Sequence, residues 1–120
     1  MFLQGEIVFA ACPNAAGTEN VNPHYLVVLG ETSEGVLCMF TTSVKEQRTG
    51  GVYAFTEAER RAAGFGKPCR FDPSRLVLYK RADKHLLKRC PGRLHQKMVQ
   101  RLLNAAMSVK ASYTTYRHAV

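Results

Sequence analysis

Short apolar runs, each closed by turn-forming residues, are the feature that most restricts the fold of this chain. They cover residues 5–12, 24–30, 36–43, 74–80 and 84–90. Each has the length of a β-strand and is shorter than an average helix. The nearly all-apolar run 24–30 predicts a strand covered on both faces, and the short segment "ETSEG" predicts a hairpin with 36–43.

A helix is expected after the last of these strands. In "GRLHQKMVQRLLNAAM" (92–107), an apolar stripe recurs at helical spacing through Leu94, Met98, Leu102 and Ala105, and polar residues lie on the opposite face. The stripe predicts that this helix packs one side against the strands.

A second, shorter helix is expected within "FTEAERRAAGFG". Thr56 is a suitable N-cap, Glu57 and Glu59 suit the positive end of the helix dipole, and Gly64 can end the helix.

Together these elements predict an α+β, mainly β fold: a small SH3-like barrel of about five strands with a C-terminal α-helix. With 120 residues the chain forms one domain. We assign residues 1–107 to this barrel domain. Residues 108–120 form a C-terminal tail that is either partly unfolded or packed over the barrel.

Charge is distributed very unevenly along the chain. Residues 1–60 contain three basic and seven acidic residues, whereas residues 61–120 contain fourteen basic and two acidic ones. Clustered Lys and Arg favour a phosphate-bearing partner, because their binding releases counterions condensed on nucleic acid. A solubilising basic face, or a surface that binds an acidic protein, would give the same composition.

The remaining composition points to an intracellular protein without a metal. No apolar run approaches the roughly 18 residues needed to cross a bilayer. The N-terminal "MFLQGEIVF" has an acidic residue where a signal peptide has basic ones, so we expect a cytoplasmic protein with no membrane association. Cys12, Cys38, Cys69 and Cys90 include no CxxC or CxxH spacing, so we expect reduced thiols and no metal or cofactor.

The order of the motifs resembles that of the MazF/PemK/Kid family of toxin endoribonucleases over about residues 4–107. The matching points are Gly5-Glu6-Ile7-Val8 in the first strand, Thr41-Thr42-Ser43 at the end of the third, and Gly92-Arg93-Leu94 before the last helix. Family members carry a basic–Pro pair at the start of the second strand, where this chain has Pro23-His24-Tyr25. At the start of the second strand the chain therefore resembles a divergent PemK-like branch of this family.

This resemblance implies a toxin-like, metal-independent endoribonuclease that cleaves single-stranded RNA. It also implies a homodimer with the RNA groove at the subunit interface, and an acidic antitoxin protein that binds this groove.

Catalysis of this kind needs a base for the ribose 2′-hydroxyl, an acid for the leaving 5′-oxygen and a cation for the phosphorane oxygens. Arg70 and Asp72 resemble the Arg-x-Asp of the family's active site, with Arg70 on the phosphate and Asp72 as the base or as the residue that orients Arg70. Alternation along an extended chain puts both side chains on one face. Thr42 could donate its hydroxyl to a phosphate oxygen, and His24 is an acid–base candidate because its unperturbed pKa is near 6.5.

Further basic residues alternate imperfectly with apolar ones and are expected to line a groove that follows the RNA backbone. They are Arg75, Lys80, Arg81, Lys84, Lys88 and Arg89.

Each of these assignments has a structural alternative. Arg70 and Asp72 could form a surface ion pair, and Asp72-Pro73-Ser74 could be a turn in which the carboxylate accepts backbone hydrogen bonds. His24 could be a packing residue beside Tyr25. The other cations could form one solvated face of the sheet.

Two further function classes remain open from the sequence. Residues 13–24 contain no Lys or Arg, which favours a non-catalytic module of the same fold that binds nucleic acid or a protein. A mobile-element or phage inhibitor would instead present an exposed apolar patch.

Overall fold

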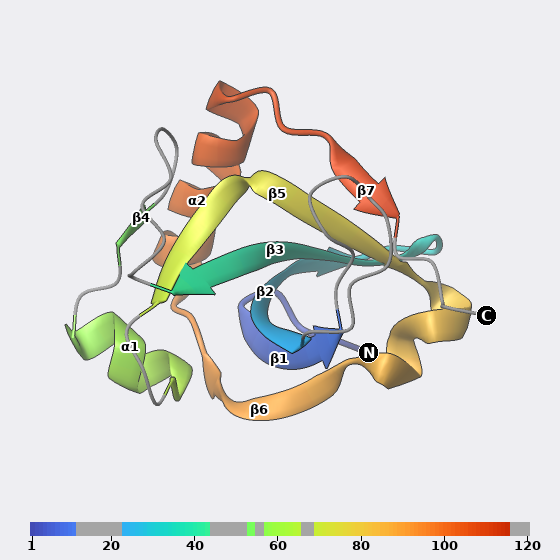
Figure 1. Ribbon diagram of the computed structural model, residues 1–120, viewed down its shortest axis with the longest axis horizontal. Coiled ribbons are helices and arrows are strands. Elements are labelled where there is room, and N and C mark those ends of the chain that lie inside the picture. The colour runs from blue at the N-terminus through green and yellow to red at the C-terminus, as the bar shows by residue number, and fades with distance from the viewer. Residues whose placement is uncertain (12–22, 44–52, 55–56, 66–68, 116–120) are drawn as a thin grey trace.

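The computed structural model describes residues 1–11, 23–43, 53–54, 57–65 and 69–115 (Figure 1). The elements in chain order are β1 (Glu6–Ala11), β2 (Pro23–Glu31), β3 (Gly35–Ser43), β4 (Tyr53–Ala54), α1 (Glu57–Ala63), β5 (Cys69–Lys80), the 3₁₀ helix η1 (Arg81–Leu86), β6 (Lys88–Arg93), α2 (Gln96–Ser108) and β7 (Tyr113–Thr115).

The strands form one strongly curved sheet in the order β4-β5-β3-β2-β1-β6, in which all neighbours are antiparallel. The short strand β7 pairs in parallel with β5. The expected α+β, mainly β class is therefore confirmed, as is the hairpin of β2 and β3. The terminal strands β4 and β6 are not paired with each other in the described part of the chain, so the sheet does not close on itself there.

The prediction of a strand at residues 84–90 is wrong for the first half of this range. Residues 81–86 form η1, and β6 begins only at Lys88. The physical reason is that the chain must pass from β5, beside β3, to β6, beside β1, on the far side of β2. A compact helical turn makes this crossing, anchored where the backbone nitrogen of Arg81 donates to the carbonyl of Glu34 at 3.2 Å.

The number and extent of the strands also differ from expectation. β5 begins at Cys69 and not at Ser74, so the Arg70–Asp72 segment lies within the strand. The described residues contain seven strands where about five were expected. The additional ones are β4 and β7, which are only two and three residues long and therefore carry little periodic signal.

Apolar residues of the sheet form two buried clusters, one on each face. In β2, Val27 and Leu29 belong to the first cluster, whereas Leu26 and Val28 belong to the second. This alternation confirms that β2 is covered on both sides, since all four residues are at most 5% exposed.

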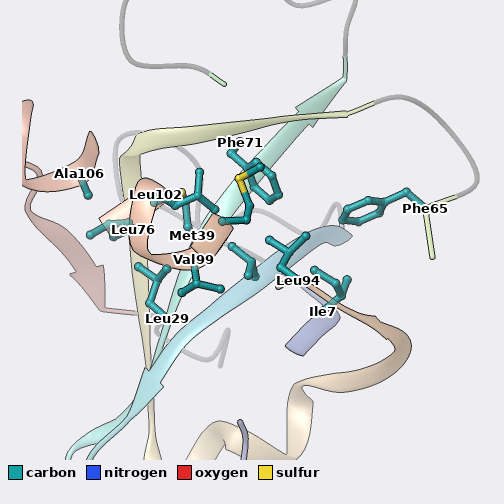
Figure 2. Packing of buried hydrophobic residues seen from close by; sticks show 12 residues of the cluster. Ile7, Leu29, Met39, Phe65, Phe71, Leu76, Leu94, Val99, Leu102 and Ala106 are labelled. Carbon is teal, nitrogen blue, oxygen red and sulfur yellow. The ribbon is translucent and has the colours of Figure 1, made fainter. Parts of the chain in front are cut away.

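Helix α2 covers the first cluster. Val99 and Leu102 of the helix lie among Leu29 and Met39 of the sheet (Figure 2). The predicted stripe is confirmed, because the buried residues of α2 are Met98, Val99, Leu102, Ala105 and Ala106. The helix begins later than expected, at Gln96, where the imidazole Nδ1 of His95 accepts a hydrogen bond from the backbone nitrogen of Lys97 at 3.1 Å.

Helix α1 ends as the sequence predicts. Gly64 adopts a φ of +74°, and the backbone nitrogen of Phe65 donates to the carbonyl of Arg60 at 3.1 Å, so the last turn closes in the left-handed manner that glycine permits. The proposed N-cap Thr56 lies outside the described residues. Among the helices that the structure describes, none has the length and apolar content that crossing a membrane requires.

Candidate functional site

The strand register brings the predicted site residues of β3 and β5 to one end of the sheet. Arg70 is the register partner of Thr42, and Asp72 is the register partner of Phe40. Directly opposed residues of an antiparallel pair project to the same side of the sheet. Arg70 and Asp72 therefore share a face, as predicted, and this is the face of Phe40 and the second cluster.

A bulge follows immediately in β5. The register with β3 passes from Asp72 opposite Phe40 to Leu76 opposite Met39, so three residues (73–75) have no partner in the ladder. Pro73 lies in this bulge, which is where a strand tolerates a residue that has no N–H to donate. The strand bends sharply near the middle of its length (Figure 1).

The carboxylate of Asp72 stabilises the bulge. It is only 2% exposed, and its Oδ1 accepts from the backbone nitrogen of Ser74 at 3.1 Å and from the Ser74 hydroxyl at 2.5 Å. This geometry is the aspartate-centred turn that the sequence left open as an alternative. Asp72 thus makes structural hydrogen bonds, whatever further part it has.

Arg70 is half-buried, and its Nε atom is buried with no hydrogen-bond partner among the residues that the structure describes. A buried donor without an acceptor costs free energy, commonly about 1–3 kcal/mol. Such unsatisfied groups are uncommon in folded proteins, and a water, an ion or a ligand is one way in which the missing acceptor is supplied. An anionic oxygen would satisfy this donor.

Phe40 organises the rest of the site. The guanidinium carbon of Arg75 lies 4.2 Å from the centroid of the Phe40 ring. The imidazole of His24 lies 6.0 Å from the same ring, centroid to centroid, at an interplanar angle of 52°. Arg75 and His24 therefore both lie beside the buried ring of Phe40, and Asp72 is the register partner of Phe40.

Sequence reasoning missed Phe40 as part of this arrangement. A signal was available, because Phe40 stands two residues before Thr42 in a strand and alternation places the two on one face. Arg75 likewise alternates with Val77 and Tyr79 of the second cluster, but its position on the same face as Asp72 had no such signal, since it depends on the bulge.

The threonines at the end of β3 have different positions. The hydroxyl of Thr41, which is 3% exposed, donates to the carbonyl of Tyr25 at 2.7 Å and so joins β3 to β2. Thr42 contributes its backbone to the pair with Arg70, but its side chain lies outside what the structure describes. Residues 12–22 and 44–52, which include the segment without Lys or Arg before His24, also lie outside the described residues.

The other cations expected to bind RNA fall into two groups. Lys84 pairs with Glu31 at 3.3 Å, and Arg89 donates to both carboxylate oxygens of Glu6, at 2.9 and 3.1 Å. The structure therefore gives these two a role in holding the N-terminal segment. Lys80, Arg81 and Lys88 are exposed.

Glu31 illustrates how this N-terminal network works. A hydrogen bond from the backbone nitrogen of Phe2, at 3.0 Å, lowers the pKa of the Glu31 carboxyl, and the Lys84 ammonium lowers it further. The guanidinium of Arg89 lies 4.3 Å above the ring of Phe2 and donates to the carbonyl of Met1 at 2.8 Å. Lys84 and Arg89 are therefore engaged in contacts within the protein.

Comparison with protein-family models found no match to this chain, and comparison with curated proteins found none either.

Proposed function

We propose that this protein is a metal-independent endoribonuclease of the toxin type, built on an SH3-like barrel and acting in the cytoplasm on single-stranded RNA. The observation that supports it is the grouping of two guanidinium groups, Arg70 and Arg75, with His24 and a buried carboxylate around Phe40 at one end of the sheet.

In the proposed reaction Arg70 binds the scissile phosphate. Its buried Nε has no acceptor within the described part of the chain, and a guanidinium bonds phosphate oxygens in pairs while remaining charged. The ribose 2′-oxygen attacks the phosphorus, the bond from phosphorus to the 5′-oxygen breaks, and a 2′,3′-cyclic phosphate forms. The 2′-hydroxyl gives up a proton and the leaving 5′-oxygen takes one.

His24 is the proposed group for proton transfer. Imidazole can accept or donate a proton near neutral pH, and His24 lies beside Phe40 on the same part of the sheet. We propose that Asp72 orients Arg70 and does not act as the base, because its buried carboxylate is bonded to Ser74. Thr42, opposite Arg70 in the register, is proposed to donate to a phosphate oxygen.

By its resemblance to the MazF/PemK/Kid family, the protein is proposed to act as a homodimer and to be inhibited by an acidic antitoxin. The exposed cations Lys80, Arg81 and Lys88 are proposed to contribute to RNA attraction at long range.

The test is incubation of the purified protein with a long single-stranded RNA in EDTA, beside Arg70→Ala and the control Arg101→Ala. Arg101 is an exposed cation of α2. We expect the wild type and the control to produce fragments with 2′,3′-cyclic phosphate ends and Arg70→Ala to produce none. Full cleavage by Arg70→Ala would remove Arg70 from the mechanism, and cleavage only after Mg²⁺ is restored would contradict a metal-independent reaction.

A second candidate is a non-catalytic module of the same fold that binds nucleic acid. The observation that favours it is the involvement of the Asp72 carboxylate in the bulge, where it is 2% exposed and bonded to Ser74 and so poorly placed to act as a base. Salt-sensitive retention of RNA without any cleavage, weakened by Arg70→Ala, would identify this function.

A further inference from the structure

We infer that Arg75, held against Phe40, forms a stacking platform for one unpaired nucleobase beside the phosphate bound by Arg70. This inference rests on the proposed function and specifies which part of a single-stranded RNA the site recognises.

The first step in the argument is the direction of the Arg75 side chain. In a regular strand a residue three positions after Asp72 would project to the opposite face, where Phe71 and Leu76 pack in the first cluster. The bulge at 73–75 breaks this alternation, and the guanidinium of Arg75 instead lies over Phe40. The bulge thus adds a second guanidinium to the face that carries Arg70 and Asp72. Bulges are over-represented beside active sites, where they re-aim a side chain.

The second step is how the guanidinium is fixed. Phe40 is 3% exposed and belongs to the second cluster, so its ring is held by the packing of its neighbours. A cation within about 6 Å of a ring centroid is attracted by the negative face of the ring. With its guanidinium carbon 4.2 Å from that centroid, Arg75 loses less conformational entropy when it binds a ligand than an extended surface arginine would.

The third step is the chemistry of the ligand. A guanidinium is planar and has two faces, of which Phe40 contacts one. Unstacked RNA bases stack on arginine planes and on aromatic rings, and this stacking discriminates single strands from duplexes. Arg75 is only half-buried, so part of its surface reaches solvent. A base stacked on Arg75 would place its 5′ or 3′ phosphate toward Arg70, which lies on the same face of β5.

The test separates stacking on a base from contact with a phosphate. Two short oligonucleotides of 2′-O-methyl RNA are compared by fluorescence anisotropy, one with bases and one of equal length that is abasic. The methylated 2′-oxygen cannot attack phosphorus, so neither is cleaved. The proteins are the wild type, Arg75→Lys, which keeps the charge and loses the plane, and Arg101→Lys as the matched control.

We expect the wild type and Arg101→Lys to bind the base-containing strand more tightly than the abasic one, by about 5- to 100-fold. In Arg75→Lys most of this ratio should be lost, while affinity for the abasic strand stays close to that of the wild type. Phe40→Leu, checked by circular dichroism for folding, should reduce the same ratio, because it removes the ring that holds Arg75.

Two results would overturn the inference and leave the proposed function intact. Equal weakening of both strands by Arg75→Lys would make Arg75 a phosphate contact. An unchanged ratio would mean that Arg75 only covers Phe40. In either case the RNA-cleavage assay with wild-type protein still reports on the nuclease. If the wild type neither binds these strands nor cleaves RNA, both proposals fail together.

Discussion

The carboxylate of Asp72 accepts two hydrogen bonds from Ser74, one from its backbone nitrogen at 3.1 Å and one from its hydroxyl at 2.5 Å. These bonds bridge Pro73 and hold the bulge of β5 in place. Asp72, which the sequence offered as a site residue, is therefore the residue that fixes the path of β5 beside Phe40.

Replacing Ser74 by Ala should destabilise the protein by about 1–2 kcal/mol, because a nearly buried carboxylate loses one charge-assisted hydrogen bond. Urea unfolding would measure the change, with the exposed Ser112→Ala as the control. A Ser74→Ala variant as stable as this control would show that the hydroxyl adds nothing to the bulge.

Gly35 and Gly30 should respond very differently to Ala. A Cβ at Gly35 would lie 2.1 Å from the carbonyl oxygen of Tyr79, whereas one at Gly30 would meet no atom of the described residues within 4 Å. We expect Gly35→Ala to lower the free energy of unfolding by about 3 kcal/mol, since the β3–β5 pairing must shift. Gly30→Ala should change it by less than about 0.5 kcal/mol. Similar unfolding midpoints for the two variants in urea would contradict this contact.

Arg89→Met should loosen the N-terminal segment. The guanidinium bonds both oxygens of Glu6, whose Oε1 also accepts from the backbone nitrogen of Leu3 at 2.9 Å. Because half of the Arg89 side chain is exposed, the expected loss is modest, about 1–2 kcal/mol. Hydrogen exchange at the Leu3 amide should become faster. The control is Lys88→Met, at an exposed neighbouring position. Equal protection of the Leu3 amide in both variants would show that Arg89 does not hold the N-terminal segment.

The pairing of Glu57 with Arg60 in helix α1 should stabilise the folded protein less in acid than at neutral pH. Hydrogen bonding from Arg60 lowers the pKa of Glu57 to about 2, from an ordinary value of 4.5. A carboxyl with a depressed pKa in the folded state stabilises that state fully above its unfolded pKa, and this contribution is lost as the pH falls from about 4.5 toward 2.

The measurement for α1 compares thermal unfolding of the wild type and Glu57→Gln across this pH range. The wild type should be the more stable at pH 7, and the difference should shrink below pH 4.5. A difference that stays constant down to pH 2 would show that Glu57 does not titrate in this window.

The sequence predicted the elements whose cause is local. Alternating and continuous apolar runs identified β2 and β3 and their hairpin, because each residue's face in a strand follows from its position alone. The stripe through Met98 and Leu102 identified the buried side of α2 for the same reason. Gly64 marked the end of α1, because few other residues adopt its backbone conformation readily.

The sequence predicted the candidate site only in part. That Arg70 and Asp72 share a face is a consequence of strand alternation, and the sequence predicted it. Which residues lie opposite them, Thr42 and Phe40, depends on the register between β3 and β5, whose sequences are separated by a long connection. The short strand β7 and the helical turn η1 likewise depend on distant partners and on the path the chain must take around the sheet.

Arg75 shows most clearly what only the tertiary structure decided. Alternation back from Val77 and Tyr79 of the second cluster puts Arg75 on the face of Phe40, whereas alternation forward from Asp72 would put it on the face under α2. The bulge, held by Asp72 and Ser74, shifts the alternation by one residue, so that Arg75 and Asp72 both lie on the face of Phe40. The sequence by itself determined the charge of Arg75 and the face that it shares with Val77, whereas its position on the same face as Asp72 came from three residues that find no partner in the ladder.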